Sequence, residues 1–151
     1  MDTLETRLHD DLTTAIRARD EVTSATLRMA LTAVKNEAVS GSEARELSDA
    51  DVVVVLGREA KKRRESATAF DDANRPELAA RERAELVVLD AYLPAQLGDD
   101  ELAELVAAAV AETGADSVKQ MGAVMKVLTP RIAGRADGGR VAAAVRAALG
   151  A

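Results

Sequence analysis

The stretch SDADVVVVLGREAKKRRES, residues 48–66, decides the fold class, because it holds the one apolar run that could form a β-strand. Four consecutive valines favour a strand by propensity, but the chain has no second apolar run of period two to pair with it. Ser48 and Asp51 match a capping box, which begins a helix. We therefore predict a helix from Asp49 to Asn74 and an all-α protein. Its inner side is expected to carry Val53, Leu56, Ala60, Ala67 and Phe70.

Apolar residues recur at steps of three and four along the rest of the chain, which indicates further amphipathic helices. The wide apolar surface of the second helix, which includes Met29, predicts a central position in the bundle. The first two helices are expected over residues 3–19 and 22–39. The fourth begins at Pro76 and stops before Pro94, and the fifth is closed by Gly114. The sixth runs from Val118 until Pro130 ends or kinks it near Leu128, and the last starts at the N-cap Asp137.

The stretch YLPAQLGDD, residues 92–100, interrupts the helical pattern and is typical of a hinge. The sequence therefore predicts an N-terminal helical bundle over residues 1–95. A small three-helix domain is expected over residues 96–151.

The amino-acid composition limits the kinds of core, catalytic site and metal site that this chain can form. Phe70 and Tyr92 are the only aromatic residues, so the core is built from aliphatic side chains. Cysteine is absent, which excludes disulfides, thiolate catalysis and Cys-ligated zinc, and the single histidine, His9, cannot form a His-rich metal site. We expect no catalytic residues, no cofactor and no metal. No apolar run is long enough for a membrane span, and the expectation is a soluble cytoplasmic protein.

Charge is distributed unevenly along the chain. The net charge is −6, but residues 117–151 carry +5 and residues 1–116 carry −11. The stretch GREAKKRRES, residues 57–66, offers i,i+4 partners such as Glu59 with Arg63 and Lys61 with Glu65, which favours a solvated, salt-bridged face over a phosphate-contacting ridge. The residues alone indicate a helical binding module with a basic C-terminal end.

The stretch AGRADGG, residues 133–139, permits two interpretations. Gly134 could reverse the chain and Asp137 could start a helix whose free N–H groups, with Arg135 and Arg140 alongside, suit a phosphate. Alternatively, it is an ordinary corner between helices in which Gly134 follows one helix and Asp137 caps the next.

Gly122 is the other unusual residue of this region, because glycine inside a helix costs about 1 kcal/mol relative to alanine. Either a neighbouring helix or the backbone of a ligand is expected to approach it closely.

Several stretches together resemble the GatB/YqeY family, in the family's order and over nearly the whole chain. They are LRMALTAVKNE (27–37), KKRRES with Phe70 and RPEL (75–78), AYLPAQL (91–97) and MGAVMKVLTPRIAGRADGGRV (121–141). YLPxQL and GRADG together are specific to the stand-alone YqeY-like members. The resemblance implies a helical bundle followed by a three-helix unit similar to the tail of the B subunit of the tRNA-dependent amidotransferase, which holds tRNA.

The tail resemblance places Lys126, Arg131, Arg135 and Arg140 in the segment that faces tRNA, although this chain reads ADGG where amidotransferase tails read more like ANP. We therefore expect a tRNA-binding or tRNA-related accessory protein without a complete active site. One alternative is an interaction module for a translation or amidotransferase partner. Another is carbon-nitrogen ligase activity with glutamine as amide donor within a complex. The candidate nucleic-acid-binding residues are Lys119, Gly122, Lys126, Arg131, Gly134, Arg135, Asp137 and Arg140.

Overall fold

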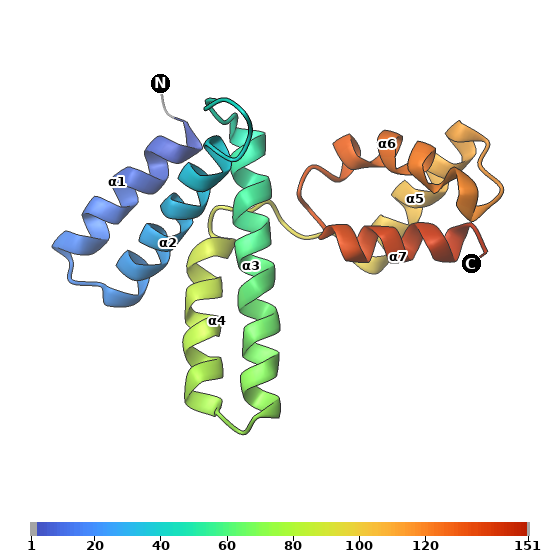
Figure 1. Cartoon of the computed structure of the whole chain (residues 1–151). Coiled ribbons are helices and arrows are strands. Elements are labelled where there is room, and N and C mark those ends of the chain that lie inside the picture. The colour runs from blue at the N-terminus through green and yellow to red at the C-terminus, as the bar shows by residue number, and fades with distance from the viewer. Residues whose placement is uncertain (1–2, 151) are drawn as a thin grey trace. The chain divides into compact units, whose positions relative to one another are not determined.

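The computed structural model describes residues 3–150, and these contain helices and connecting segments but no strand (Figure 1). The predicted all-α class is confirmed. The helices are α1 (Leu4–Arg17), α2 (Glu21–Ala38), α3 (Asp49–Asp72), α4 (Pro76–Asp90), α5 (Asp99–Thr113), α6 (Met121–Ile132) and α7 (Gly138–Ala148), with a 3-10 turn, η1 (Val118–Gln120), directly before α6. The chain divides into two compact units: unit 1 ends at Leu93 and unit 2 begins at Pro94.

The valine run is helical. The Ser48 hydroxyl accepts a hydrogen bond from the Asp51 N–H at 3.1 Å, and the Asp51 carboxylate accepts one from the Ser48 N–H at 3.0 Å, so the capping box is complete. Val52 is 1% exposed while Val54 is 48% exposed, whereas a strand would place both on one face. The helix ends at Asp72, two residues before the expected end, because Asn74 adopts a positive φ of 59°.

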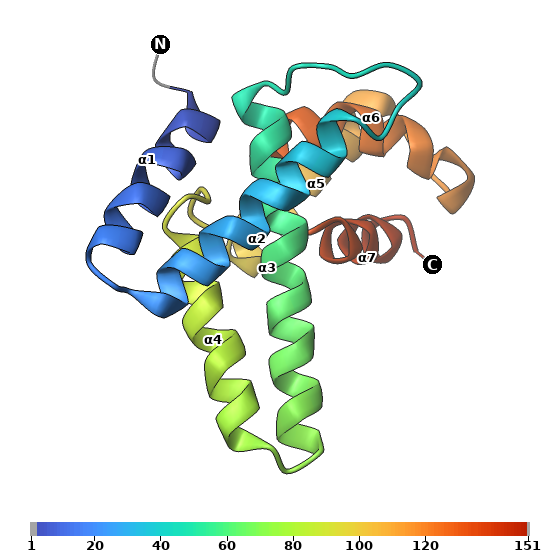
Figure 2. The same ribbon diagram turned by 60° about the vertical axis from the view of Figure 1, so that its left-hand side comes forward.

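Two helical hairpins build unit 1: α1 with α2, and α3 with α4 (Figure 1). Figure 2 shows α2 lying obliquely across α3. Their shared core is fully aliphatic, as the composition required, and its largest members are Leu8, Leu27, Val34, Val52, Leu56 and Leu89. Three expectations need correction, because Val53 and Phe70 are only half-buried and Met29 is 50% exposed. Helix α2 is central, but one edge of its wide apolar surface faces solvent.

The basic run at 61–64 is not a uniformly solvated face, because Arg63 is 5% exposed. It follows Leu56 and Ala60 at helical spacing and therefore points into the same interior. Its Nη1 donates to the Glu59 carboxylate at 2.5 Å, so the expected pair forms, but in a buried setting. Its Nη2 lies 3.6 Å from the sulfur of Met29, while Nε has no partner within the described chain.

Unit 2 packs α5, α6 and α7 around a second aliphatic core that includes Leu102, Val106, Val124, Leu128, Val141 and Val145. Gly114 ends α5 in the left-handed region, with φ 68°. The sequence predicted that this helix would end or kink near Leu128, but α6 continues through Pro130 to Ile132. Proline in the last turn removes only one main-chain hydrogen bond, and burial of Ile132 in the core holds that turn in place.

A pair of valine substitutions tests the helical register of α3. Val52→Ala is expected to lower the free energy of unfolding by about 2 kcal/mol, because two buried methyl groups are lost. Val54→Ala is the matched control and should be neutral or slightly stabilising, since it removes exposed apolar surface and raises helix propensity. Chemical denaturation measures both. Equal losses for the two variants would contradict the register described.

Candidate functional site

The two motifs most specific to the sequence resemblance bind each other inside unit 2. The linker segment, residues 94–98, lies between helices, and the carbonyl groups of its residues Ala95 and Leu97 take part in no helical hydrogen bond. Arg135 Nε donates to the carbonyl of Ala95 at 2.9 Å, and Arg140 Nη1 donates to that of Leu97 at 2.7 Å. In return the Leu97 N–H donates to the Arg135 carbonyl at 2.8 Å. Arg135 of the GRADG stretch, together with Arg140 just after it, therefore holds the linker segment and its buried residue Leu97 to the rest of unit 2.

The arginines of the C-terminal end also pair with acids of α5. Arg140 lies 2.7 Å from Asp99, Arg135 lies 3.7 Å from Glu101, and Arg131 makes a two-pronged contact with Glu112 at 2.6 and 2.8 Å. A hydrogen bond from Arg131, together with its charge, lowers the pKa of Glu112.

Charge balance within unit 2 follows from these pairs. Unit 2 as a whole carries seven acidic and six basic side chains, so its net charge is −1. The basic tail of the linear sequence is thus largely neutralised within its own domain.

The stretch at 133–139 forms the helix corner rather than an open anion site. Ala133 and Gly134 both have positive φ, 49° and 80°, and they reverse the chain after α6. Asp137 caps α7, since its carboxylate accepts the N–H of Arg140 at 3.0 Å. That carboxylate occupies the place where a phosphate would meet the helix N-terminus. Gly134, Arg135, Asp137 and Arg140 do come together as expected, but the contacts they make hold the fold.

Three other predicted residues lie apart from this corner and face outward. Lys119, Gly122 and Lys126 are exposed, and neither lysine forms an ion pair with any residue that the structure describes. Gly122 and Lys126, four residues apart, share one side of α6, and Lys119 lies in η1, three residues before Gly122. We call these three residues the α6 basic face. Arg146 on α7 is also exposed and is a cation that the sequence analysis did not select.

Gly122 does not serve internal packing. A Cβ placed there would meet no atom within 4 Å, so the expected approach of a neighbouring helix is wrong for the described chain. The glycine lies on the solvent side of α6, opposite the buried Val124 and Leu128. The surroundings of Gly122 within the described chain therefore give it no packing role.

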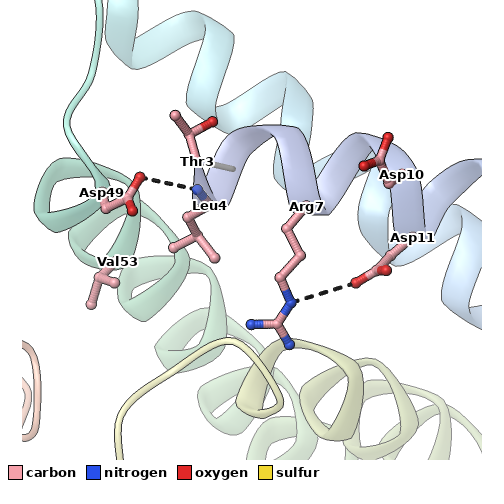
Figure 3. A pocket seen from close by; sticks show the side chains of 7 residues that line it. All are labelled: Thr3, Leu4, Arg7, Asp10, Asp11, Asp49 and Val53. Carbon is pink, nitrogen blue, oxygen red and sulfur yellow. Dashed lines mark hydrogen bonds and ion pairs between the residues drawn. The ribbon is translucent and has the colours of Figure 1, made fainter. Parts of the chain in front are cut away.

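Unit 1 contains a separate open pocket between α1 and α3, with a volume of about 550 Å³. Figure 3 shows Asp49 bonded to the main-chain N–H of Leu4, and Arg7 directed toward Asp11. Arg7 also stacks over Tyr92, whose hydroxyl donates to Asp11 at 2.5 Å. Burial, followed by the bond to Asp11, raises the pKa of Tyr92. These polar groups largely satisfy one another, and none of the predicted site residues belongs to the pocket.

Across residues 3–150 no three His, Asp or Glu side chains are grouped so that they could hold a metal ion. His9 is exposed on α1. None of the helices within that range combines the length and the apolar character that a bilayer crossing requires.

Hydrogen bonds thus join the YLPAQL stretch to Arg135 of the GRADG stretch. A family model described as Yqey-like protein matches residues 5–149. The chain belongs to the YqeY-like family. The match spans both units, including the linker segment, the helix corner and the α6 basic face. A comparison with curated proteins gave no match.

The helix corner of this YqeY-like chain can be tested by substitution of Arg140. Arg140→Met should lower the stability of unit 2 by about 2 kcal/mol, because the carbonyl of Leu97 loses a charged donor. The ion pair with Asp99 adds little, since Asp99 is 96% exposed. Arg146→Met, on the same helix but exposed, is the control and should change stability by less than about 0.5 kcal/mol.

Native-state hydrogen exchange of unit 2 core amides measures this difference without interference from unit 1. Equal protection factors in the two variants would show that the Arg140 bond to the linker segment is dispensable.

Proposed function

We propose that this YqeY-like protein is an RNA-contacting accessory protein of translation that binds tRNA through the α6 basic face. The observation that carries the proposal is that Lys119 and Lys126 are exposed and form no ion pair within residues 3–150, while Arg131, Arg135 and Arg140 are engaged by acids or carbonyl groups of unit 2. Lysines without partners can neutralise phosphates at no cost in broken pairs. The resemblance to the tail of the amidotransferase B subunit supports tRNA as the RNA class.

The charge of the rest of the molecule limits where RNA could bind. Unit 1 carries a net charge of −5 and unit 2 a net charge of −1, so most of the surface repels a polyanion. Arg131 and Glu112 are both substantially exposed, and such pairs are weak, so Arg131 could exchange its carboxylate for a phosphate. The expected interaction is therefore of modest affinity, centred on α6 and strongly dependent on salt.

A double charge reversal tests the proposal. Lys119→Glu/Lys126→Glu should abolish most tRNA binding at low salt. Each lost phosphate contact lowers the slope of log K against log salt by about 0.7–0.9, so the slope should fall by about 1.5. Fluorescence anisotropy of labelled tRNA at a series of salt concentrations measures both quantities.

The matched control is Arg28→Glu/Lys35→Glu, which reverses two exposed charges seven residues apart on α2 of unit 1. This variant should retain the slope of the parent, since the two cations lie outside the α6 basic face. If both double variants lost tRNA to the same degree, binding would reflect overall charge and not this surface.

The net negative charge of both units is a specific observation in favour of the second candidate, a module that binds a translation or amidotransferase protein partner. A parent protein that binds no tRNA even at low salt, yet forms a complex that survives high salt and nuclease, would support this function. Recovery of RNA alone would contradict it.

A further inference from the structure

Gly122 has no role that the fold of unit 2 explains. Gly114 and Gly134 adopt positive φ and terminate helices, but Gly122 lies within α6 without a positive φ. No atom of the described chain lies within 4 Å of the position that its Cβ would take. Because glycine is the weakest non-proline helix former, it weakens α6 without an internal compensation. The bare main chain at this position is therefore open to a ligand.

The surroundings of Gly122 indicate what approaches it. Lys119, in η1, precedes it by three residues, and Lys126, about one turn further along α6, follows it by four. Both are exposed and without ion pairs in the part of the chain that the structure describes. Two exposed cations that flank an open stretch of main chain complement a phosphodiester backbone.

Aromatic residues distinguish the two kinds of RNA that could supply this backbone. Single-stranded RNA is held by stacking its splayed bases on aromatic side chains, whereas helical RNA is recognised by shape and by its phosphates and 2′-hydroxyl groups. The two aromatic residues of the chain, Phe70 and Tyr92, both belong to unit 1. Unit 2 therefore offers cations and an open main chain but no stacking platform.

We propose that the α6 basic face binds the sugar-phosphate backbone of base-paired RNA, and this inference rests on the proposed function. Gly122 sets the preference for base-paired over single-stranded RNA, because it lets this backbone reach the main chain of α6. The two lysines supply the charge that holds the RNA. Gly122 supplies the close fit, which a side chain at this position would oppose in proportion to its size. The two contributions are separable, because a substitution at Gly122 can change the shape and leave the charge unaltered.

The test uses an RNA duplex of about 16 base pairs and one of its strands alone as probes in fluorescence anisotropy. The parent should bind the duplex at least about tenfold more tightly than the single strand. Gly122→Leu should weaken duplex binding by about tenfold, with the salt slope unchanged because no cation is removed. Gly122→Ala should give a smaller loss. Ala108→Leu, at an exposed position of α5 in the same unit, is the control and should bind as the parent does.

Folding does not confound the result, since leucine and alanine favour a helix more than glycine, and both Gly122 variants should have a Tm at or above that of the parent. Duplex binding by Gly122→Leu equal to that of the parent, or equal binding of single strand and duplex, would overturn this inference alone, provided that Lys119→Glu/Lys126→Glu still loses RNA. A parent that binds neither RNA at low salt would overturn the proposed function together with it.

Discussion

The guanidinium group of Arg140 joins three parts of unit 2 through one side chain. It donates to the carbonyl of Leu97 at 2.7 Å and pairs with Asp99 at the start of α5, while its own N–H is held by the cap of α7. Arg135 repeats the arrangement one step earlier, at Ala95. Because the carbonyl groups of Ala95 and Leu97 take part in no helical hydrogen bond, these charged donors are what satisfy them. The position of Leu97 in the core follows from them.

Because Arg131, Arg135 and Arg140 are held by such contacts, the charge pattern along the sequence does not show which cations are available to bind RNA. Along the chain, an acidic stretch that includes α5 precedes a basic one, which suggests a basic tail available for RNA. In the fold, acids of α5 pair with Arg131 near the end of α6 and with Arg135 and Arg140 after it, and the net charge of unit 2 is −1. The cations that carry the proposed function are therefore two exposed lysines, Lys119 in η1 and Lys126 in α6, which pair with no acid among the residues that the structure describes.

The helical elements could be predicted from local patterns because their causes are local. The capping box at Ser48, the left-handed Gly114 and the cap at Asp137 each act within a few residues of the helix end that they define. The failures had tertiary causes. Burial of Ile132 in the core holds the last turn of α6 beyond Pro130. Arg63 lies on the buried side of α3, although its charge predicted an exposed position.

The sequence by itself determined the all-α class, the helices with their caps, the aliphatic cores and the family. Only the tertiary structure decided which of the predicted site residues face outward. Arg135 and Arg140 meet partners about forty residues earlier in the chain, and no local pattern records such distances. The same holds for Gly122, because a glycine that accommodates a neighbouring helix and one that faces solvent look alike until the surrounding atoms are placed.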